Sequence, residues 1–168
     1  GVTMDNIYAA FEASFPDYSL GKCSEEDFWK KFLYLSRANR EDLKYVKAFW
    51  RRNQKENERM LSLLRSLKGK YRLAGLTTIP REWLMFKRKK FHLDDYFEFI
   101  VSSGEYGIKK PELSIYKIVI DKLNLAPEEL VFIDNKENLL PPARKLGMQT
   151  ILFRGQKDLE EKLSRLLK

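Results

Sequence analysis

Residues that could bind a phosphate group follow three successive apolar runs of the sequence. Thr77, Lys110 and Asp134 each come directly after, or in the loop after, a run typical of a buried strand. A hydroxyl and an ammonium group donate hydrogen bonds to phosphate oxygens, and a carboxylate supplies an oxygen ligand to Mg²⁺. Their types and order therefore point to a site that binds a phosphate group together with a hard cation.

Each of these residues also has an ordinary structural explanation. Taken singly, Thr77 is a common turn residue, Lys110 a surface lysine and Asp134 a helix cap. Ligands of open α/β sheets bind outside the carboxyl ends of the strands. The functional interpretation depends on all three residues occurring, in order, at such strand ends.

The elements that must position this site alternate along the chain from residue 71 onwards. Strands are expected at 71–76, 97–101, 130–133 and 149–153. Helices are expected at 81–91 and 158–167, and two further helices lie between them: one that begins at residue 111 and one that follows the strand at 130–133 and ends near residue 146. Strands separated by helices of about 10 to 14 residues predict right-handed βαβ units and a parallel sheet covered on both faces. The expected fold class is α/β.

The sequence from Ser24 to Lys68 is a nearly continuous helical pattern. Ser24 and the acidic residues after it predict an N-cap, a second helix is expected from Asn39, and a third ends at Gly69. We expect these helices to form a hairpin or small bundle. The residues expected on their inward faces are Phe28, Phe32, Leu35, Leu43, Val46, Phe49, Met60, Leu61, Leu64 and Leu67.

Composition limits the class of protein. Of the 168 residues 43% are hydrophobic and 13% aromatic, which suits one globular domain or a core with a small insertion. No apolar run reaches the ~20 residues of a membrane span, so no membrane partner is expected. The single cysteine, Cys23, excludes an internal disulfide and favours a reducing, cytoplasmic location.

The chain is basic, with 32 Lys and Arg against 24 Asp and Glu and a formal charge of +8. This excess is compatible with an anionic substrate, a nucleic-acid partner or solubility alone. The densest basic run is 86–91, and a second lies at 50–52. Both fall in helical patterns, where a solvated face is the simpler interpretation.

Three segments together resemble the motifs of the haloacid dehalogenase (HAD) superfamily. LAGLTTIPREW resembles its second motif, VSSGEYGIKKPELSIYKIV its third and LVFIDNKENLLPPARKLGMQTILF its fourth. The similarity runs from about Tyr71 to Phe153 and is nearest to the phosphatase-like subfamily with a small helical cap. It implies a Rossmann-like parallel sheet, with residues 1–7 and 70–168 as the HAD-like core and an inserted α-helical cap at 8–69.

The resemblance also implies a reaction. In this family an aspartate of the first motif attacks the phosphorus of a phosphomonoester, and water hydrolyses the resulting aspartyl-phosphate. Thr77 and Lys110 are then catalytic, with Thr78 joining them in phosphate binding, and Asp134 is a ligand of Mg²⁺. Asn135, which replaces a more usual second acid, would act through a water molecule and should weaken Mg²⁺ binding.

The first motif itself is not among the 168 residues. Gly1 and Val2 resemble residues that follow the nucleophile, which would lie three positions before Gly1. Asp5 is a poor substitute, because no apolar strand precedes it. We expect a longer protein that carries this strand at the centre of the sheet; the rival hypothesis is a natural pseudoenzyme in which another segment or chain replaces it.

The resulting prediction is a hydrolase of a small phosphorylated substrate. Dehalogenase and phosphomutase activities remain alternatives, although a metal-binding acid favours phosphate-ester hydrolysis. The other alternative is a non-catalytic family member or a basic binding module for anions or nucleic acid. A nucleic-acid partner is not expected, because no aromatic binding motif accompanies Lys87–Lys90.

The aromatic residues of the cap could line a substrate pocket or pack within the cap. They are Phe11, Phe15, Tyr18, Phe28 and Trp29. The sequence leaves the identity of the substrate and the oligomeric state open.

Overall fold

The computed structural model describes residues 3–167, so the resemblance drawn on Gly1 and Val2 lies outside the described residues. The chain forms two compact units. The helical unit contains the described residues up to Asn57 together with 78–93 and 102–107. The sheet unit contains 58–77, 94–101 and the described residues from 108 onwards.

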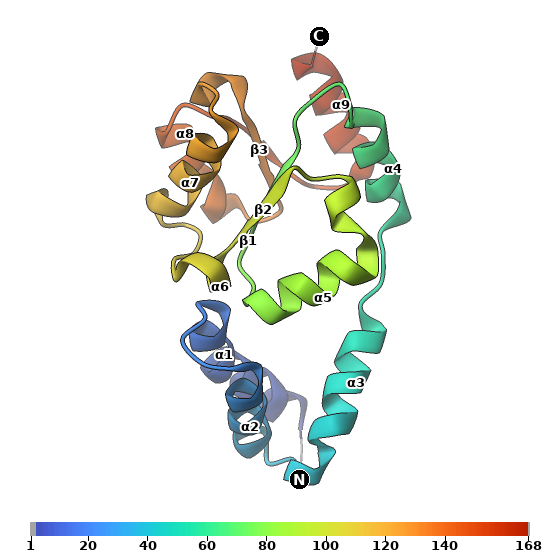
Figure 1. The fold of residues 1–168 in the computed structure, drawn as a ribbon, viewed down its shortest axis with the longest axis vertical. Helices are drawn as coiled ribbons and strands as arrows, with labels where there is room; N and C mark the ends of the chain where they lie inside the picture. Colours follow the sequence, from blue (N-terminus) through green and yellow to red (C-terminus); the bar gives the residue numbers. More distant parts are fainter. Residues whose placement is uncertain (1–2, 168) are drawn as a thin grey trace. The chain divides into compact units, whose positions relative to one another are not determined.

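The helical unit is built from helices (Figure 1). They are α1 (Met4–Ser19), α2 (Glu25–Ser36), the 3₁₀ helix η1 (Arg40–Asp42), α3 (Leu43–Asn53), α5 (Arg81–Phe91) and α6 (Ser103–Tyr106). The expected helices α2, α3 and α5 are confirmed. Helix α1 lies mostly within the segment expected as a helical cap, although no separate helix was predicted there; it begins where the Thr3 hydroxyl accepts a hydrogen bond from the Asn6 amide at 3.2 Å.

The N-cap expected at Ser24 is present as a capping box. The Ser24 hydroxyl accepts a hydrogen bond from the Asp27 amide at 3.1 Å, and the Asp27 carboxylate accepts one from the Ser24 amide at 3.3 Å. Two backbone amides that the first turn leaves without intrahelical partners are thereby satisfied. This local sequence therefore fixes where α2 starts.

An aromatic core holds the helical unit together. Tyr18, Phe28, Trp29 and Trp83 are buried, and Phe11, Phe15, Phe32, Leu43, Val46 and Trp50 pack against them. The sequence left open whether Tyr18, Phe28 and Trp29 line a substrate pocket or pack within the cap. Their burial in this cluster supports packing.

Two residues expected on inward faces are exposed. Leu35 is 38% exposed and Phe49 61% exposed, so both expectations were wrong. The buried side of α2 follows Trp29 and Leu33 instead, and Trp50 takes the inward position on α3. On α3 the larger indole ring of Trp50, next to Phe49 in the sequence, is the one that packs inward.

One glycine of the helical unit is required by packing. A Cβ atom on Gly104 would lie 2.6 Å from the Cα atom of Pro80 and 2.6 Å from the amide nitrogen of Arg81. The Gly104 amide also donates a hydrogen bond to the Ile79 carbonyl at 3.1 Å. The start of α6 can therefore approach the start of α5 this closely only with glycine.

The strands of the sheet unit alternate with helices along the chain, as expected, although α5, the helix between β1 and β2, belongs to the helical unit. Its elements are α4 (Glu58–Leu67), β1 (Ala74–Thr77), β2 (Phe99–Ser102), α7 (Leu113–Leu123), β3 (Val131–Asp134), α8 (Leu140–Lys145), β4 (Gln149–Leu152) and α9 (Gln156–Leu166), with 3₁₀ turns η3 (Pro127–Glu129) and η4 (Glu137–Leu139). The first residue of the 3₁₀ turn η2 (Leu93–Asp95) and the last residue of β2 belong to the helical unit. The four expected strands and the α/β class are confirmed. The segment 102–110, expected as a loop, contains α6.

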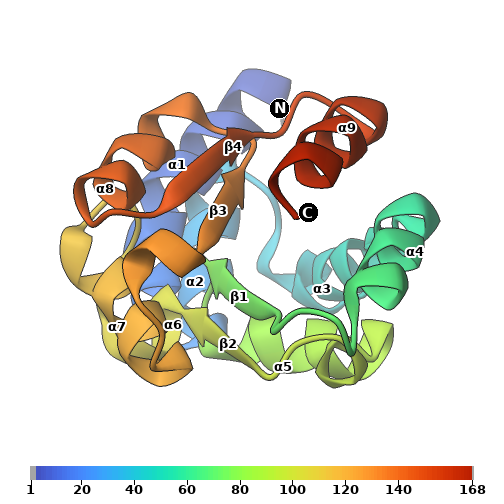
Figure 2. The ribbon, with the colours of Figure 1, turned by 90° about the horizontal axis from the view of Figure 1, so that it is seen from above.

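The strands form two hydrogen-bonded pairs rather than one continuous sheet. β1 pairs with β2, and β3 pairs with β4 in parallel, with Val131 opposite Gln149 and Asp134 opposite Leu152. Figure 2 shows the strands in the order β4, β3, β1, β2. Within residues 3–167, β1 and β3 each therefore have a strand partner on one edge only.

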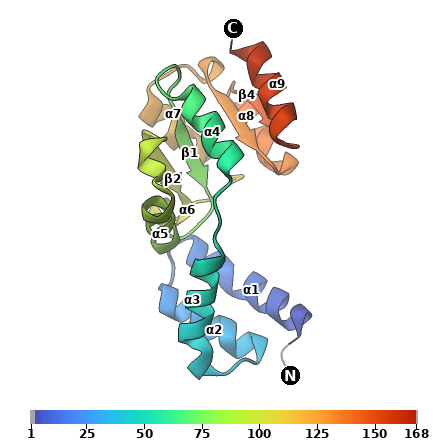
Figure 3. The ribbon, with the colours of Figure 1, turned by 90° about the vertical axis from the view of Figure 1, so that its right-hand side faces the viewer.

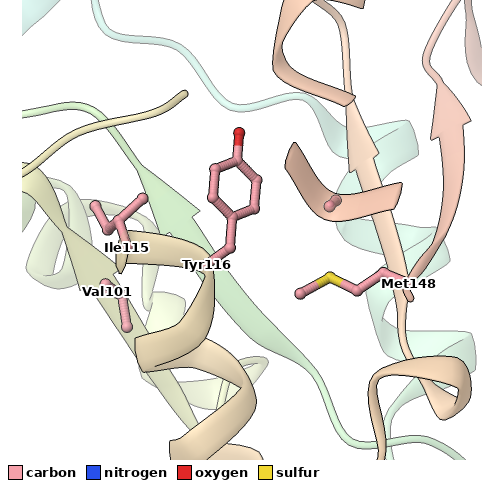
Figure 4. Packing of buried hydrophobic residues seen from close by; sticks show 5 residues of the cluster. Val101, Ile115, Tyr116 and Met148 are labelled. Atoms are coloured by element: carbon pink, nitrogen blue, oxygen red, sulfur yellow. The ribbon is translucent and has the colours of Figure 1, made fainter. Parts of the chain in front are cut away.

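Helices cover both faces of these strands. Figure 4 shows Ile115 and Tyr116 of α7 beside Val101 and Met148 in the first core cluster, which also includes Ala143 of α8. In the second cluster, Leu159 and Leu163 of α9 pack with Ile151 of β4, and α4 lies beside α9 in Figures 1 and 3.

Among residues 3–167, no helix has the length and apolar character that crossing a membrane requires.

Candidate functional site

The sheet unit contains a buried ion pair between two of the predicted site residues. The Lys110 Nζ atom lies 2.6 Å from the Asp134 Oδ2 atom, and the two side chains are only 10% and 8% exposed. Lys110 comes from the loop before α7, and Asp134 is the last residue of β3. The structure therefore brings together the ammonium group and the carboxylate that the sequence placed after two successive strands of the chain.

The Asp134 carboxylate is held from two sides. Its Oδ2 atom accepts from Lys110, and its Oδ1 atom accepts from the backbone amide of Lys136 at 2.9 Å. The Lys110 Nζ atom also lies 5.7 Å from the centre of the Phe132 ring, within cation–π range. Both charged groups are thus oriented before any ligand binds, which limits the reorganisation that binding would require.

The remaining predicted residues lie where the strands end. Thr77 is the last residue of β1 and is half-buried, and Thr78 follows it at the beginning of a segment of the helical unit. Asn135 is exposed directly after β3. Only Lys110 and Asp134 are joined by a direct hydrogen bond in the geometry described for these residues.

A magnesium ion at this position would depend on few protein ligands. In the part of the chain that the structure describes, no group of three or more His, Cys, Asp or Glu residues could hold a metal ion. Mg²⁺ commonly binds through one or two carboxylates together with phosphate oxygens and water molecules, rather than in an all-protein cage. The single carboxylate of Asp134, beside the amide of Asn135, fits that kind of site.

Tyr116 lies close to the site, and no role was predicted for it from the sequence. Its side chain is buried, and its hydroxyl donates a hydrogen bond to the Leu139 carbonyl at 2.7 Å. Burial first, and then the charge of Asp134, raise the pKa of Tyr116 to about 12. The ring also packs edge-on against Phe132 of β3, so Tyr116 supports the strand that presents Asp134. The sequence indicated only that Tyr116 follows Ile115 in a helix with an apolar inward face.

Ser103 is a second residue without an assigned role. It is fully buried in the helical unit, and its hydroxyl is within hydrogen-bond distance of the Ser19 carbonyl at 2.5 Å and the Ile79 carbonyl at 3.3 Å. These contacts fix the segment after β2 to α1 and to the start of α5. In the sequence, the only indication of such a role was that two serines, Ser102 and Ser103, directly follow an apolar strand.

A comparison with protein families decides the classification. The sequence model of the family described as haloacid dehalogenase-like hydrolase matches residues 3–153. The chain belongs to this family. The resemblance read from the three motifs is confirmed, and the match extends it back through the helical segment before Tyr71.

Curated HAD-like relatives include phosphatases. The chain is 38% identical to rat (Rattus norvegicus) bifunctional epoxide hydrolase 2 over 107 residues, which are 58% of the chain and 19% of that protein. It is 32% identical to glyceraldehyde 3-phosphate phosphatase of Methanocaldococcus jannaschii over 90 residues, 52% of the chain and 38% of the relative. It is 28% identical to phosphorylated carbohydrates phosphatase of Thermotoga maritima over 98 residues, 58% of the chain and 45% of the relative. The chain thus spans less than half the length of each of these relatives.

Solved structures agree with the HAD-like fold. A HAD family enzyme of Bacteroides thetaiotaomicron, solved as a magnesium complex, superposes with a TM-score of 0.77 at 25% identity, covering 89% of this chain and 79% of that one. A predicted HAD-like hydrolase of Porphyromonas gingivalis superposes with a TM-score of 0.73 at 21% identity, covering 99% and 91%. The second likeness concerns the fold alone.

Proposed function

We propose that this chain contributes the phosphate- and metal-binding part of a Mg²⁺-dependent phosphomonoester phosphatase. The observation that carries the proposal is the buried ion pair of Lys110 and Asp134 at the end of β3. Burying two charges is costly, and an apolar pair of similar volume is often as stable or more so. A buried ion pair at the end of a strand in a HAD-like fold is thus better explained by ligand binding than by stability.

In this proposal each residue has a separate task. The Lys110 ammonium neutralises charge on the transferring phosphoryl group, and the hydroxyls of Thr77 and Thr78 donate hydrogen bonds to its oxygens. Before the substrate binds, Asp134 holds the Lys110 ammonium in place at 2.6 Å. When the anion arrives, Lys110 exchanges one anionic partner for another without leaving its position.

Asp134 is the proposed protein ligand of Mg²⁺, and Asn135 would orient a metal-bound water molecule. The ion, when bound, would supply positive charge next to the phosphate oxygens. Because Asn135 contributes no charge, we expect this site to bind Mg²⁺ more weakly than a site with two carboxylates.

The proposed nucleophile is an aspartate on a strand that lies between β1 and β3. Both strands have an open edge within residues 3–167, and Ile133, in the middle of β3, is 38% exposed. A strand inserted there would pair both edges and cover Ile133. Its aspartate would form the new bond to phosphorus as the ester bond breaks, and water would then hydrolyse the aspartyl-phosphate.

The proposed domain roles follow the sequence analysis: a catalytic core of 1–7 and 70–168 and a cap of 8–69. The proposed substrate is a small phosphorylated molecule, in keeping with the names of the phosphatase relatives. We also propose a cytoplasmic enzyme, because the single cysteine is compatible with a reducing compartment.

The alternative of a basic binding module centred on 87–90 has less support. The Lys90 ammonium donates hydrogen bonds to the carbonyls of Arg51 and Gln54, at 2.9 and 2.7 Å. It therefore closes the C-terminal end of α3, where backbone carbonyls lack intrahelical partners. At least this member of the basic run has a structural role.

Hydrolysis of p-nitrophenyl phosphate tests the proposal. The protein carrying the aspartate-bearing strand should release p-nitrophenol in a Mg²⁺-dependent manner, and Asp134→Ala or Lys110→Met should lower kcat/KM about 10²-fold or more. Asp158→Ala is the matched control, because Asp158 is also paired with a lysine, Lys162, at 2.7 Å but on α9. Turnover that survives both site substitutions would contradict the proposal.

A further inference from the structure

Helix α3 carries two apolar stripes, and only one of them is covered. Leu43, Val46 and Trp50 pack against the aromatic core of the helical unit. On the other side, Tyr45 is 73% exposed and Phe49 61% exposed. Residues four apart are neighbours on a helix surface, so the two rings form one outward patch.

The charge of α3 is entirely of one sign. Its 11 residues include Lys44, Lys47, Arg51 and Arg52 and no acidic residue. Lys44 and Arg52 are exposed and flank the outward rings at positions one before Tyr45 and three after Phe49. The outward face therefore combines exposed aromatic rings with positive charge.

More apolar surface is exposed on the neighbouring helix. Tyr34 is 75% exposed and Leu35 38% exposed in the last turn of α2, which packs against η1 and α3. Figure 1 shows α2 and α3 converging towards the connection between them. A contiguous exposed apolar patch, unlike scattered single residues, marks an interaction site.

We propose that the outward face of α3 docks the protein on the surface of an anionic lipid bilayer. Tyr45 and Phe49 would enter the headgroup region, where aromatic side chains are favoured, while Lys44 and Arg52 would contact lipid phosphates. This is a peripheral contact. The short apolar runs of the sequence excluded a membrane span, but they do not exclude this mode of binding.

Other occupants fit the face less well. A second copy of the chain, docked through the same face, would place Lys44 and Arg52 of one α3 near those of another, with no acidic residue in either helix. Single-stranded nucleic acid is best held in a basic groove that contains stacking platforms. The basic and aromatic side chains of α3 are instead the kinds found on helices that lie at a lipid surface.

Vesicle co-sedimentation tests the proposal. The protein should sediment with vesicles of equimolar phosphatidylcholine and phosphatidylglycerol, and not with phosphatidylcholine alone. Lys44→Gln and Arg52→Gln should each weaken binding about fivefold, because a basic residue near such a surface contributes about that factor. The double variant Tyr45→Ala/Phe49→Ala should weaken binding about tenfold or more.

The controls change exposed lysines elsewhere. Lys145→Gln and Lys157→Gln remove positive charge at exposed positions of the sheet unit and should change binding by less than about twofold. Circular dichroism checks that each variant is folded. Equal losses in the control variants would contradict the proposal, because net charge would then explain binding.

Three further outcomes would overturn it. The first is no sedimentation with anionic vesicles at low salt. The second is binding of a single-stranded oligonucleotide that competes with vesicles and is lost in the same α3 variants, which would make nucleic acid the occupant. The third is a dimer in analytical ultracentrifugation that Tyr45→Ala/Phe49→Ala converts to a monomer.

Discussion

The end of β3 in the sheet unit and the aromatic core of the helical unit use their buried side chains in opposite ways. Asp134 is paired with Lys110, so two full charges are nearly buried. In the helical unit the buried centre is formed by rings such as Phe28 and Trp83, whose centroids are 5.6 Å apart. Buried rings contribute directly to stability, whereas a buried ion pair is a weak source of it. The aromatic core therefore maintains the fold, and the buried ion pair is the feature on which the proposed ligand site depends.

The exposure of the strands fits this contrast. Every residue of β1 is only half-buried, and β3 exposes Ile133. Helix α2 instead buries Phe28, Trp29 and Leu33 among described neighbours. The strands that present the predicted site residues thus have the less complete surroundings, as expected if a further strand joins β1 and β3.

The largest effect on stability should come from the aromatic core. Trp83→Ala should lower the free energy of unfolding by about 3–5 kcal/mol, because it removes a buried ring that packs against Tyr18, Phe28 and Trp50. Met85→Ala, on the same helix but 58% exposed, should stay within about 0.5 kcal/mol of the parent. Urea denaturation measures both, and similar losses in the two variants would remove the distinction.

An intermediate effect is expected at the ion pair. Lys110→Met should lower the free energy of unfolding by about 1–3 kcal/mol, because Asp134 would remain nearly buried without its cation. The double variant Lys110→Met/Asp134→Leu should cost less than Lys110→Met, because no unpaired charge is left.

The control for that pair is Lys162→Met. Lys162 pairs with Asp158 at a similar distance of 2.7 Å, but both side chains are more than a third exposed, so a cost of about 0–1 kcal/mol is expected. A double-mutant cycle by chemical denaturation gives the coupling energies. Equal coupling in the buried and the exposed pair would show that burial does not distinguish the site.

The smallest effect should come from a helix end. Ser24→Ala should cost about 1 kcal/mol, because it removes the hydroxyl that accepts a hydrogen bond from the Asp27 amide. Ser66→Ala, where an exposed hydroxyl only donates to the Leu63 carbonyl, should change stability by less than about 0.5 kcal/mol. Thermal unfolding of the two variants compares them, and an equal loss would mean that the cap contributes nothing specific.

Much of the fold and of the candidate site could be predicted because the signals are local. Ser24 and Asp27 form a cap from residues three apart, and the apolar run before Asp134 specifies a strand whose end presents that residue. The placement of Lys110 next to Asp134 required only the rule that ligand-binding residues of α/β sheets gather at strand ends.

The remaining features depend on tertiary contacts. Phe49 was expected inside because it follows Val46 in the helical pattern, but Trp50 packs against Trp83 with a centroid distance of 4.0 Å and turns Phe49 outward. The role of Tyr116 depends on a hydrogen bond to Leu139, 23 residues away in the sequence. No local pattern encodes such pairings.

The most direct measurement of the central claim is a crystal structure of the protein with Mg²⁺ and tungstate, an anion that mimics phosphate. Tungstate can be located by its anomalous scattering, and the residues involved are all within the chain. We predict tungstate in contact with the Lys110 ammonium and the Thr77 hydroxyl, and Mg²⁺ bound to the Asp134 carboxylate. An intact Lys110–Asp134 pair with tungstate bound only elsewhere, such as on the basic face of α3, would contradict it.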